Sequence, residues 1–127
     1  MSGSFGTPRP GSLPTVSRSV IFATSYGDRT GTIPVDVAYR VDRARGQLFL
    51  NGARVTAEQL ASFARMVSDF RPQFLRGFPS LLVLLAREMN ALRRPVWLKA
   101  VLTGGELLGE AQRDYLSQTF GCPAYDW

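Results

Sequence analysis

Leu98-Lys99-Ala100-Val101-Leu102-Thr103-Gly104-Gly105-Glu106 begins as an apolar run and ends in two glycines ahead of a predicted helix. A run this short is too brief for a buried helix and is typical of an inner strand of a parallel sheet. Adjacent glycines let the backbone turn sharply and let another molecule approach it closely. Ligands of open α/β sheets bind beyond the carboxyl ends of the strands, where this turn would lie. We therefore expect a small-molecule site with residues 103–106 on its rim.

Short apolar runs alternate with helical patterns along the chain. Expected strands cover residues 19–24, 47–50, 74–76, 98–103 and 123–127, and expected helices cover residues 56–70, 81–92 and 109–119. Because the connections are short, this alternation predicts parallel crossovers and a layered α/β fold, with a mostly parallel sheet and flanking helices. Residues 30–40 show no clear pattern, and Pro34 argues against a central strand there.

By composition the chain divides into two parts. Residues 1–17 are rich in Ser, Gly and Pro and have no apolar period, which predicts a flexible segment. Residues 18–127 are long enough for one core, and the overall hydrophobic share of 45% is that of a globular protein. The last expected strand runs to Trp127, so we expect an incomplete α/β domain that continues in the remainder of a larger protein.

Several residues predict where the helices begin and end. Thr56 with Gln59 has the spacing of a capping box, and Pro72 follows the end of the same helix. We expect Ser80 to cap the second helix and Gly121 to close the third. Apolar side chains at helical spacing predict the buried faces of the first and third helices: Leu60, Phe63, Ala64, Val67 and Phe70, then Ala111, Tyr115, Leu116 and Phe120.

The positive charge is spread along the sequence. The formal net charge is +5 and the isoelectric point is about 10.1, but the arginines are scattered, without a long basic run or interleaved aromatic residues. A nucleic-acid footprint usually clusters on one face. The pattern favours a solvated arginine-rich surface and no specific nucleic-acid partner.

Cysteine and histidine usage restricts the chemistry. Cys122 is the single cysteine and there is no histidine, so an internal disulfide and a Cys/His metal set are both excluded. Without a histidine to activate it, Cys122 is better interpreted as a small packed residue than as a nucleophile. No apolar stretch approaches the ~20 residues of a membrane span, and the N-terminus lacks the pattern of a signal peptide. We expect a cytoplasmic protein.

Near the N-terminus lies a glycine-rich loop with hydroxyl groups, Ser2-Gly3-Ser4-Phe5-Gly6-Thr7-Pro8-Arg9. Backbone N–H groups of such a loop can surround phosphate oxygens, and Ser or Thr hydroxyls add donors. A flexible start built from small residues explains the same composition. Both interpretations stay open at this level.

Three further stretches, taken in order, resemble a known family. They are Phe70-Arg71-Pro72-Gln73-Phe74-Leu75-Arg76-Gly77-Phe78-Pro79-Ser80, then Leu102-Thr103-Gly104-Gly105-Glu106-Leu107-Leu108 with Arg113, then Phe120-Gly121-Cys122-Pro123-Ala124-Tyr125-Asp126. Together they look like the phenylacetate-CoA ligase branch of the adenylate-forming (AMP-binding) enzymes, including relatives in capsular polysaccharide biosynthesis. The resemblance extends over residues 47–127.

The resemblance implies an activity and cofactors. Such enzymes activate a carboxylic acid with ATP and Mg²⁺, form an acyl-adenylate and pyrophosphate, and usually pass the acyl group to coenzyme A. That chemistry depends on positioning and on charge neutralisation around the α-phosphate more than on a protein nucleophile.

The resemblance also implies roles for particular residues. Thr103, Gly104, Gly105 and Glu106 match the segment along the adenine, and Gly77, Phe78, Pro79 and Ser80 match the turn that begins the acyl-pocket helix. Asp126 matches the aspartate before the family's Tyr-Gly-x-x-Glu motif. Ser2, Gly3, Ser4 and Gly6 resemble part of the family's phosphate loop, although Phe5 stands at a hydroxyl position, no strand precedes the loop, and the segment that follows is short.

Other family parts fall outside this sequence. They are the Tyr-Gly-x-x-Glu motif with its magnesium ligand, the ribose-binding aspartate, and the C-terminal domain with its adenylation lysine. We therefore expect no catalytic residue and no metal ligand here, and a ligase fragment that is inactive on its own. A non-catalytic nucleotide-binding or interaction module is the alternative, and for Glu106 a plain strand-to-helix turn, with the carboxylate near a helix start, also stays open.

Overall fold

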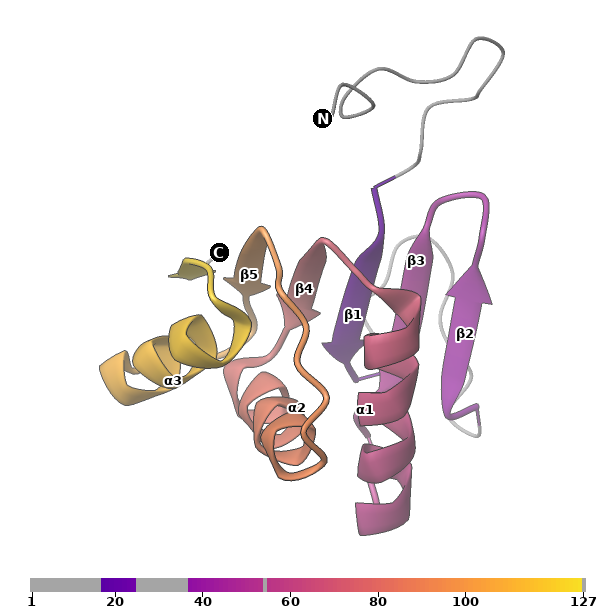
Figure 1. The fold of residues 1–127 in the computed structure, drawn as a ribbon, viewed down its shortest axis with the longest axis horizontal. Coiled ribbons are helices and arrows are strands. Elements are labelled where there is room, and N and C mark those ends of the chain that lie inside the picture. The colour runs from indigo at the N-terminus through magenta and orange to yellow at the C-terminus, as the bar shows by residue number, and fades with distance from the viewer. Residues whose placement is uncertain (1–16, 25–36, 54, 127) are drawn as a thin grey trace, which may run out of the picture.

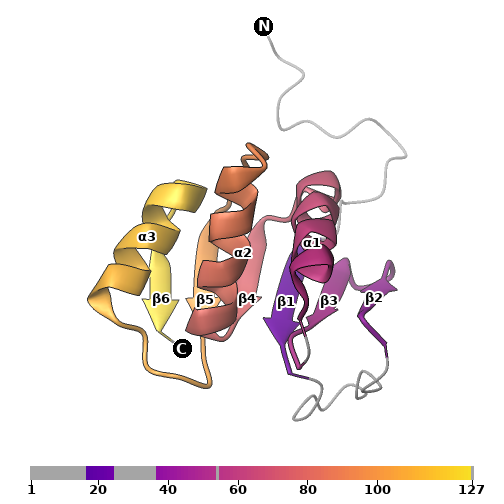
Figure 2. The ribbon, with the colours of Figure 1, turned by 90° about the horizontal axis from the view of Figure 1, so that it is seen from below.

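The computed structural model describes residues 17–24, 37–53 and 55–126, which form a six-stranded sheet with three helices on one face (Figures 1 and 2). The strands are β1 (Ser19–Ala23), β2 (Tyr39–Asp42), β3 (Gln47–Asn51), β4 (Phe74–Gly77), β5 (Ala100–Thr103) and β6 (Ala124–Asp126). The helices are α1 (Ala57–Phe70), α2 (Pro79–Ala91) and α3 (Glu110–Phe120). The predicted layered α/β fold is confirmed.

The sheet has the order β2-β3-β1-β4-β5-β6. β1 lies in its interior and pairs in parallel with β3 and β4, and the β4–β5 and β5–β6 pairs are also parallel. Only β2 is antiparallel to its neighbour β3. The carboxyl ends of the five parallel strands therefore meet at one edge, which we call the carboxyl edge.

The sequence did not predict β2. This edge strand has only four residues, and its apolar side chains Tyr39 and Val41 are both exposed. A strand at the edge of a sheet that buries few side chains shows little apolar pattern in its sequence. The conformation of β2 is therefore determined by its pairing with β3 and not by its own residues.

The core lies between the sheet and the helices. From β1, Val20 and Phe22 point into it and are fully buried, as are Leu75 of β4 and Val101 of β5. The ring of Phe22 meets that of Phe63 from α1 edge to face, with centroids 5.7 Å apart. Aromatic pairs of this geometry add stabilisation beyond the area they bury, so the central strand is held firmly against α1.

Helix α1 agrees with its prediction. Thr56 and Gln59 form the capping box, in which the side chain of each accepts from the other's backbone N–H. The helix ends at Arg71, which is left-handed and donates its N–H to the carbonyl of Val67, and Pro72 follows. Phe63, Ala64 and Val67 are buried as expected.

Helix α2 begins differently from the prediction. Its N-cap is Phe78, which makes no side-chain cap hydrogen bond, and Pro79 is the first helical residue. Ser80 is therefore inside the first turn, and the expectation that it caps the helix is wrong. Proline suits the first helical position because it lacks the N–H group that would be unsatisfied there.

Helix α3 buries Leu116 and Phe120 and is closed by Gly121 in the left-handed conformation, as predicted. Ala111, expected on the buried side, is exposed instead. Among the described residues, no helix has the length and apolar character needed to cross a membrane.

Candidate functional site

The two segments singled out in the sequence lie side by side at the carboxyl edge. Gly77 and Thr103 are register partners at the ends of β4 and β5, and the N–H of Gly104 donates to the carbonyl of Gly77 over 3.0 Å. Figure 2 shows α2 starting at this edge, next to the connection from β5 to α3. Segments 77–80 and 103–106, separated by more than twenty residues in sequence, thus form one surface.

The Glu106 carboxylate joins the two segments. One oxygen accepts from the backbone N–H of Ser80 at 3.1 Å, and the other accepts from the Ser80 hydroxyl at 3.0 Å. The first N–H groups of a helix have no partner within it, and a negative charge is favoured there. Glu106 therefore caps α2, the helix that precedes its own loop, and not the helix that follows it in sequence.

Gly105 is in contact with Phe78. Its φ is +81°, and a Cβ at this position would lie 2.7 Å from Cδ1 of the Phe78 ring. A residue with a side chain is disfavoured here twice, by the backbone conformation and by the ring. This glycine is explained by local structure whether or not a ligand binds.

Gly77 is required by a close approach between strands. With φ of +155°, its Cβ would lie 2.9 Å from the carbonyl carbon of Phe22 at the end of β1. The same Phe22 carbonyl accepts from the N–H of Phe78 at 3.3 Å. The start of α2 is thereby fixed to the central strand.

Thr103 and Asp126 lie next to each other at the ends of β5 and β6, where they are register partners. Thr103 is fully buried, and its hydroxyl donates to the carbonyl of Tyr125 at 3.0 Å. Its side chain thus ties β6 to β5. Asp126 is exposed at the same edge.

The remaining predicted nucleotide contacts, Ser2, Gly3, Ser4 and Gly6, fall outside the described residues. The candidate site therefore consists of residues 77–80, 103–106 and 126, which we call the carboxyl-edge site.

At this site, backbone N–H groups that can bind a nucleotide are exposed, whereas side chains that can bind a metal ion are few. Gly105 and Glu106 are exposed, and within the described residues no group accepts a hydrogen bond from either N–H. Such N–H groups on a glycine turn can hold the edge of a base or an anionic oxygen. The described residues contain no cluster of three His, Cys, Asp or Glu, and both Glu106 oxygens accept hydrogen bonds from Ser80.

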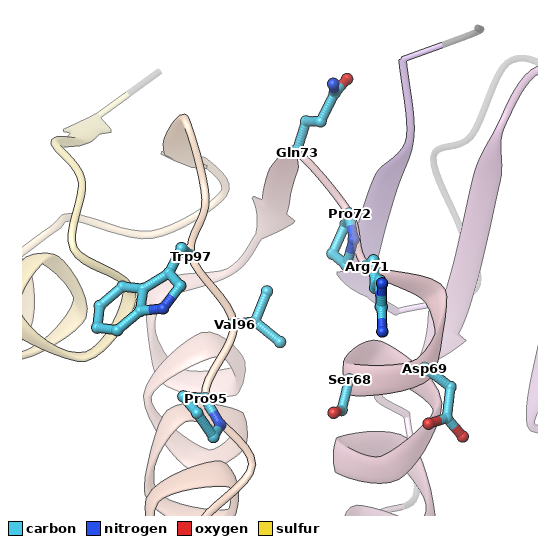
Figure 3. A pocket seen from close by; sticks show the side chains of 8 residues that line it. All are labelled: Ser68, Asp69, Arg71, Pro72, Gln73, Pro95, Val96 and Trp97. Carbon is cyan, nitrogen blue, oxygen red and sulfur yellow. The ribbon is translucent and has the colours of Figure 1, made fainter. Parts of the chain in front are cut away.

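A hollow of about 550 Å³ lies at the opposite edge of the sheet, between the end of α1 and the segment before β5 (Figure 3). Its lining residues are Ser68, Asp69, Arg71, Pro72, Gln73, Pro95, Val96 and Trp97. None of these was predicted to belong to the site. The indole of Trp97 points away from Arg71 and lies against Gly121 (Figure 3).

Cys122 is half-buried beside the end of α3, and burial raises the pKa of its thiol. A raised pKa lowers the thiolate fraction at neutral pH, and the thiolate is the nucleophile. This agrees with the interpretation of Cys122 as a packed residue.

Sequence reasoning missed the contacts that hold the site together. It identified the Thr103–Glu106 turn and the Gly77–Ser80 turn, but not the Glu106–Ser80 bonds or the Phe78–Gly105 packing. The only available signal was that both turns follow strands that were expected to be parallel. Register between those strands, which the sequence does not give, places the two turns together.

No protein-family model and no curated protein matches the sequence.

Solved structures do match. 2-Hydroxyisobutyryl-CoA ligase in the postadenylation state, in complex with R3-HIB-AMP, aligns with a TM-score of 0.58 at 16% identity over 89% of this chain and 24% of the ligase. The open conformation of the same ligase, with 2-HIB-AMP and CoA, aligns with a TM-score of 0.57 at 15% identity over 89% of this chain and 27% of the ligase. A benzoate CoA ligase from Burkholderia xenovorans LB400 aligns with a TM-score of 0.50 at 23% identity over 87% of this chain and 22% of that ligase. The chain thus has the fold of one part of these CoA ligases and spans about a quarter of their length.

Proposed function

We propose that this chain is part of an ATP-dependent carboxylic acid–CoA ligase of the adenylate-forming type, in the phenylacetate-CoA ligase-like branch. The observation that carries the proposal is the union of residues 77–80 and 103–106 at the carboxyl edge by the Gly104–Gly77 and Glu106–Ser80 hydrogen bonds. These are the segments that the sequence resemblance assigns to the acyl pocket and to the adenine. The fold shared with CoA ligases supports the same proposal.

In such a ligase, ATP supplies the adenylyl group that activates the acid carboxylate, and coenzyme A then accepts the acyl group. The role of this chain is to bind and orient. Gly105 and Glu106 offer two exposed N–H groups for the adenine side of the nucleotide. Phe78 fixes the conformation of that loop through Gly105, and Thr103 holds β6 and Asp126 beside it.

The chain is proposed to be inactive without the remainder of the ligase. Among the described residues there is no cluster of three His, Cys, Asp or Glu, and the sequence resemblance does not extend to the family's adenylation lysine. We therefore propose that other parts of a larger ligase bind Mg²⁺ and supply the catalytic lysine. We also propose that the assembled protein is cytoplasmic.

The acid substrate is proposed to be apolar or aromatic, because aliphatic residues follow Ser80. Several of these residues have a structural role as well. Leu82 and Leu85 are fully buried in the core against the sheet, while Leu84 is exposed. Packing of the core accounts for the same aliphatic residues.

The second candidate is a non-catalytic module that binds a nucleotide through the same loop. The N–H groups of Gly105 and Glu106, which have no acceptor within the part of the chain that the structure describes, support this candidate as well, because binding by backbone groups needs no catalytic partner.

Two measurements test these functions. We expect ATP–pyrophosphate exchange to be absent with this chain and any apolar acid, and exchange above that of a Gly105→Trp control would contradict the proposed inactivity. The intact mass of the protein made from its own gene in its natural host is expected to exceed 14.0 kDa. A mass of 14.0 kDa would favour the non-catalytic module.

A further inference from the structure

We infer that Glu106 is a positioning residue, which couples nucleotide affinity at residues 104–106 to the first turn of α2. The inference rests on the proposed function, because it assigns a regulator of affinity within the same site. It starts from a feature that neither the fold nor the proposed reaction requires. The Glu106 side chain lies in the proposed nucleotide-binding loop but forms its hydrogen bonds with Ser80 of helix α2.

The contact between Glu106 and Ser80 consists of two hydrogen bonds. Both carboxylate oxygens of Glu106 are used, one by the N–H and one by the hydroxyl of the same residue, Ser80. Charge-assisted hydrogen bonds are stronger than neutral ones, and a two-point contact also fixes orientation. Ser80 is itself fixed, because Phe78 before it bonds to the central strand β1 through the Phe22 carbonyl.

The loop has few other anchors. Gly104 is held by its N–H bond to Gly77, whereas the N–H groups of Gly105 and Glu106 are unengaged within the described residues. Leu107, directly after Glu106, is 90% exposed and contributes no packing. After Glu106, the next anchor is Leu108, which is partly buried against the core just before Gly109, the N-cap of α3. Without the Glu106 carboxylate, residues 105–107 would lose their hydrogen bonds to the first turn of α2.

Positioning and charge make different predictions. If Glu106 acts by holding the loop, its removal weakens the binding of adenosine and the binding of AMP alike. If it acts only as a negative charge near the phosphate, its removal strengthens AMP and leaves adenosine unchanged. The substitution Glu106→Gln would keep an oxygen for the Ser80 N–H and add an amide that can donate to the Ser80 hydroxyl, so it separates geometry from charge.

The test measures dissociation constants of adenosine and of AMP for the full chain by titration of a ¹⁵N-labelled sample, at a temperature where every variant is folded. We expect Glu106→Ala to weaken both ligands by about tenfold, the loss of roughly one charge-assisted hydrogen bond. Glu106→Gln should stay within about threefold of the parent, a fraction of that loss. Ser80→Ala should weaken both ligands, and Ser80→Ala/Glu106→Ala no more than Glu106→Ala. Asp114→Ala, which removes an exposed carboxylate on α3, is the control and should change neither.

The outcomes are distinguishable. If the parent chain binds neither ligand, the proposed nucleotide site is wrong. If the parent binds and Glu106→Ala keeps both affinities, or tightens AMP only, the positioning role is wrong.

A ligand-free measurement tests the contact itself. Hydrogen exchange of the Ser80 amide should accelerate in Glu106→Ala and not in Asp114→Ala, since Glu106 is the acceptor of that N–H. An unchanged Ser80 exchange rate would overturn the inference without any nucleotide.

Discussion

Replacing Gly105 by alanine tests the packing of the carboxyl-edge site. The φ of +81° is unfavourable for a residue with a Cβ, which costs about 1 kcal/mol. The added Cβ would also lie 2.7 Å from Cδ1 of Phe78, so the ring must move out of its place at the start of α2. Displacing a half-buried ring costs roughly another 1 kcal/mol. We expect Gly105→Ala to lower the free energy of unfolding by about 2 kcal/mol.

The two contributions are separable by a double-mutant cycle in urea, followed by circular dichroism. In a Phe78→Ala background the ring is gone, so Gly105→Ala should cost only the backbone part, about 1 kcal/mol. The coupling energy is then about 1 kcal/mol. Additive effects of the two substitutions would refute the contact between Phe78 and Gly105, and a parent-like Gly105→Ala would refute the left-handed loop as well.

Other substitutions test the core, the tie between β5 and β6, and the buried thiol. Phe63→Ala should lower the free energy of unfolding by about 3–5 kcal/mol in the same urea assay, because it removes the fully buried partner of Phe22; Leu107→Ala, at an exposed site, should be neutral. Thr103→Val should cost about 1–2 kcal/mol and speed amide exchange in β6, since the Tyr125 carbonyl loses its buried donor; slow exchange in β6 would argue against this tie. Cys122 should react with a disulfide reagent at pH 8 more slowly in the folded chain than in denaturing urea, because burial raises the pKa of the thiol; equal rates would contradict it.

Much of the fold was predictable because local signals and burial agree. The capping box of Thr56 and Gln59, the stop at Pro72 and the closure at Gly121 each depend on residues close together in sequence, and all three are observed. The inner strands were identified from their short apolar runs, and the core-facing side chains Val20, Phe22, Leu75 and Val101 of those runs are fully buried. β2 was missed because an exposed edge strand carries no such demand.

The sequence predicted which residues form the carboxyl-edge site but not which of them contact one another. Proline at position 79 starts α2 one residue before Ser80, so the expected Ser80 cap gives way to a carboxylate from another loop. The partner of that first turn, Glu106, lies 26 residues away. Such a contact follows from strand register, which no local pattern encodes.

Titration of the ¹⁵N-labelled full chain with AMP tests the central claim most directly. We predict saturable shifts of the amides of residues 104–106 and 77–80, excluding Pro79, with the indole N–H of Trp97 at the opposite edge unmoved. The absence of saturable shifts, or shifts centred on Trp97 and its neighbours, would contradict the placement of a nucleotide site at the carboxyl edge.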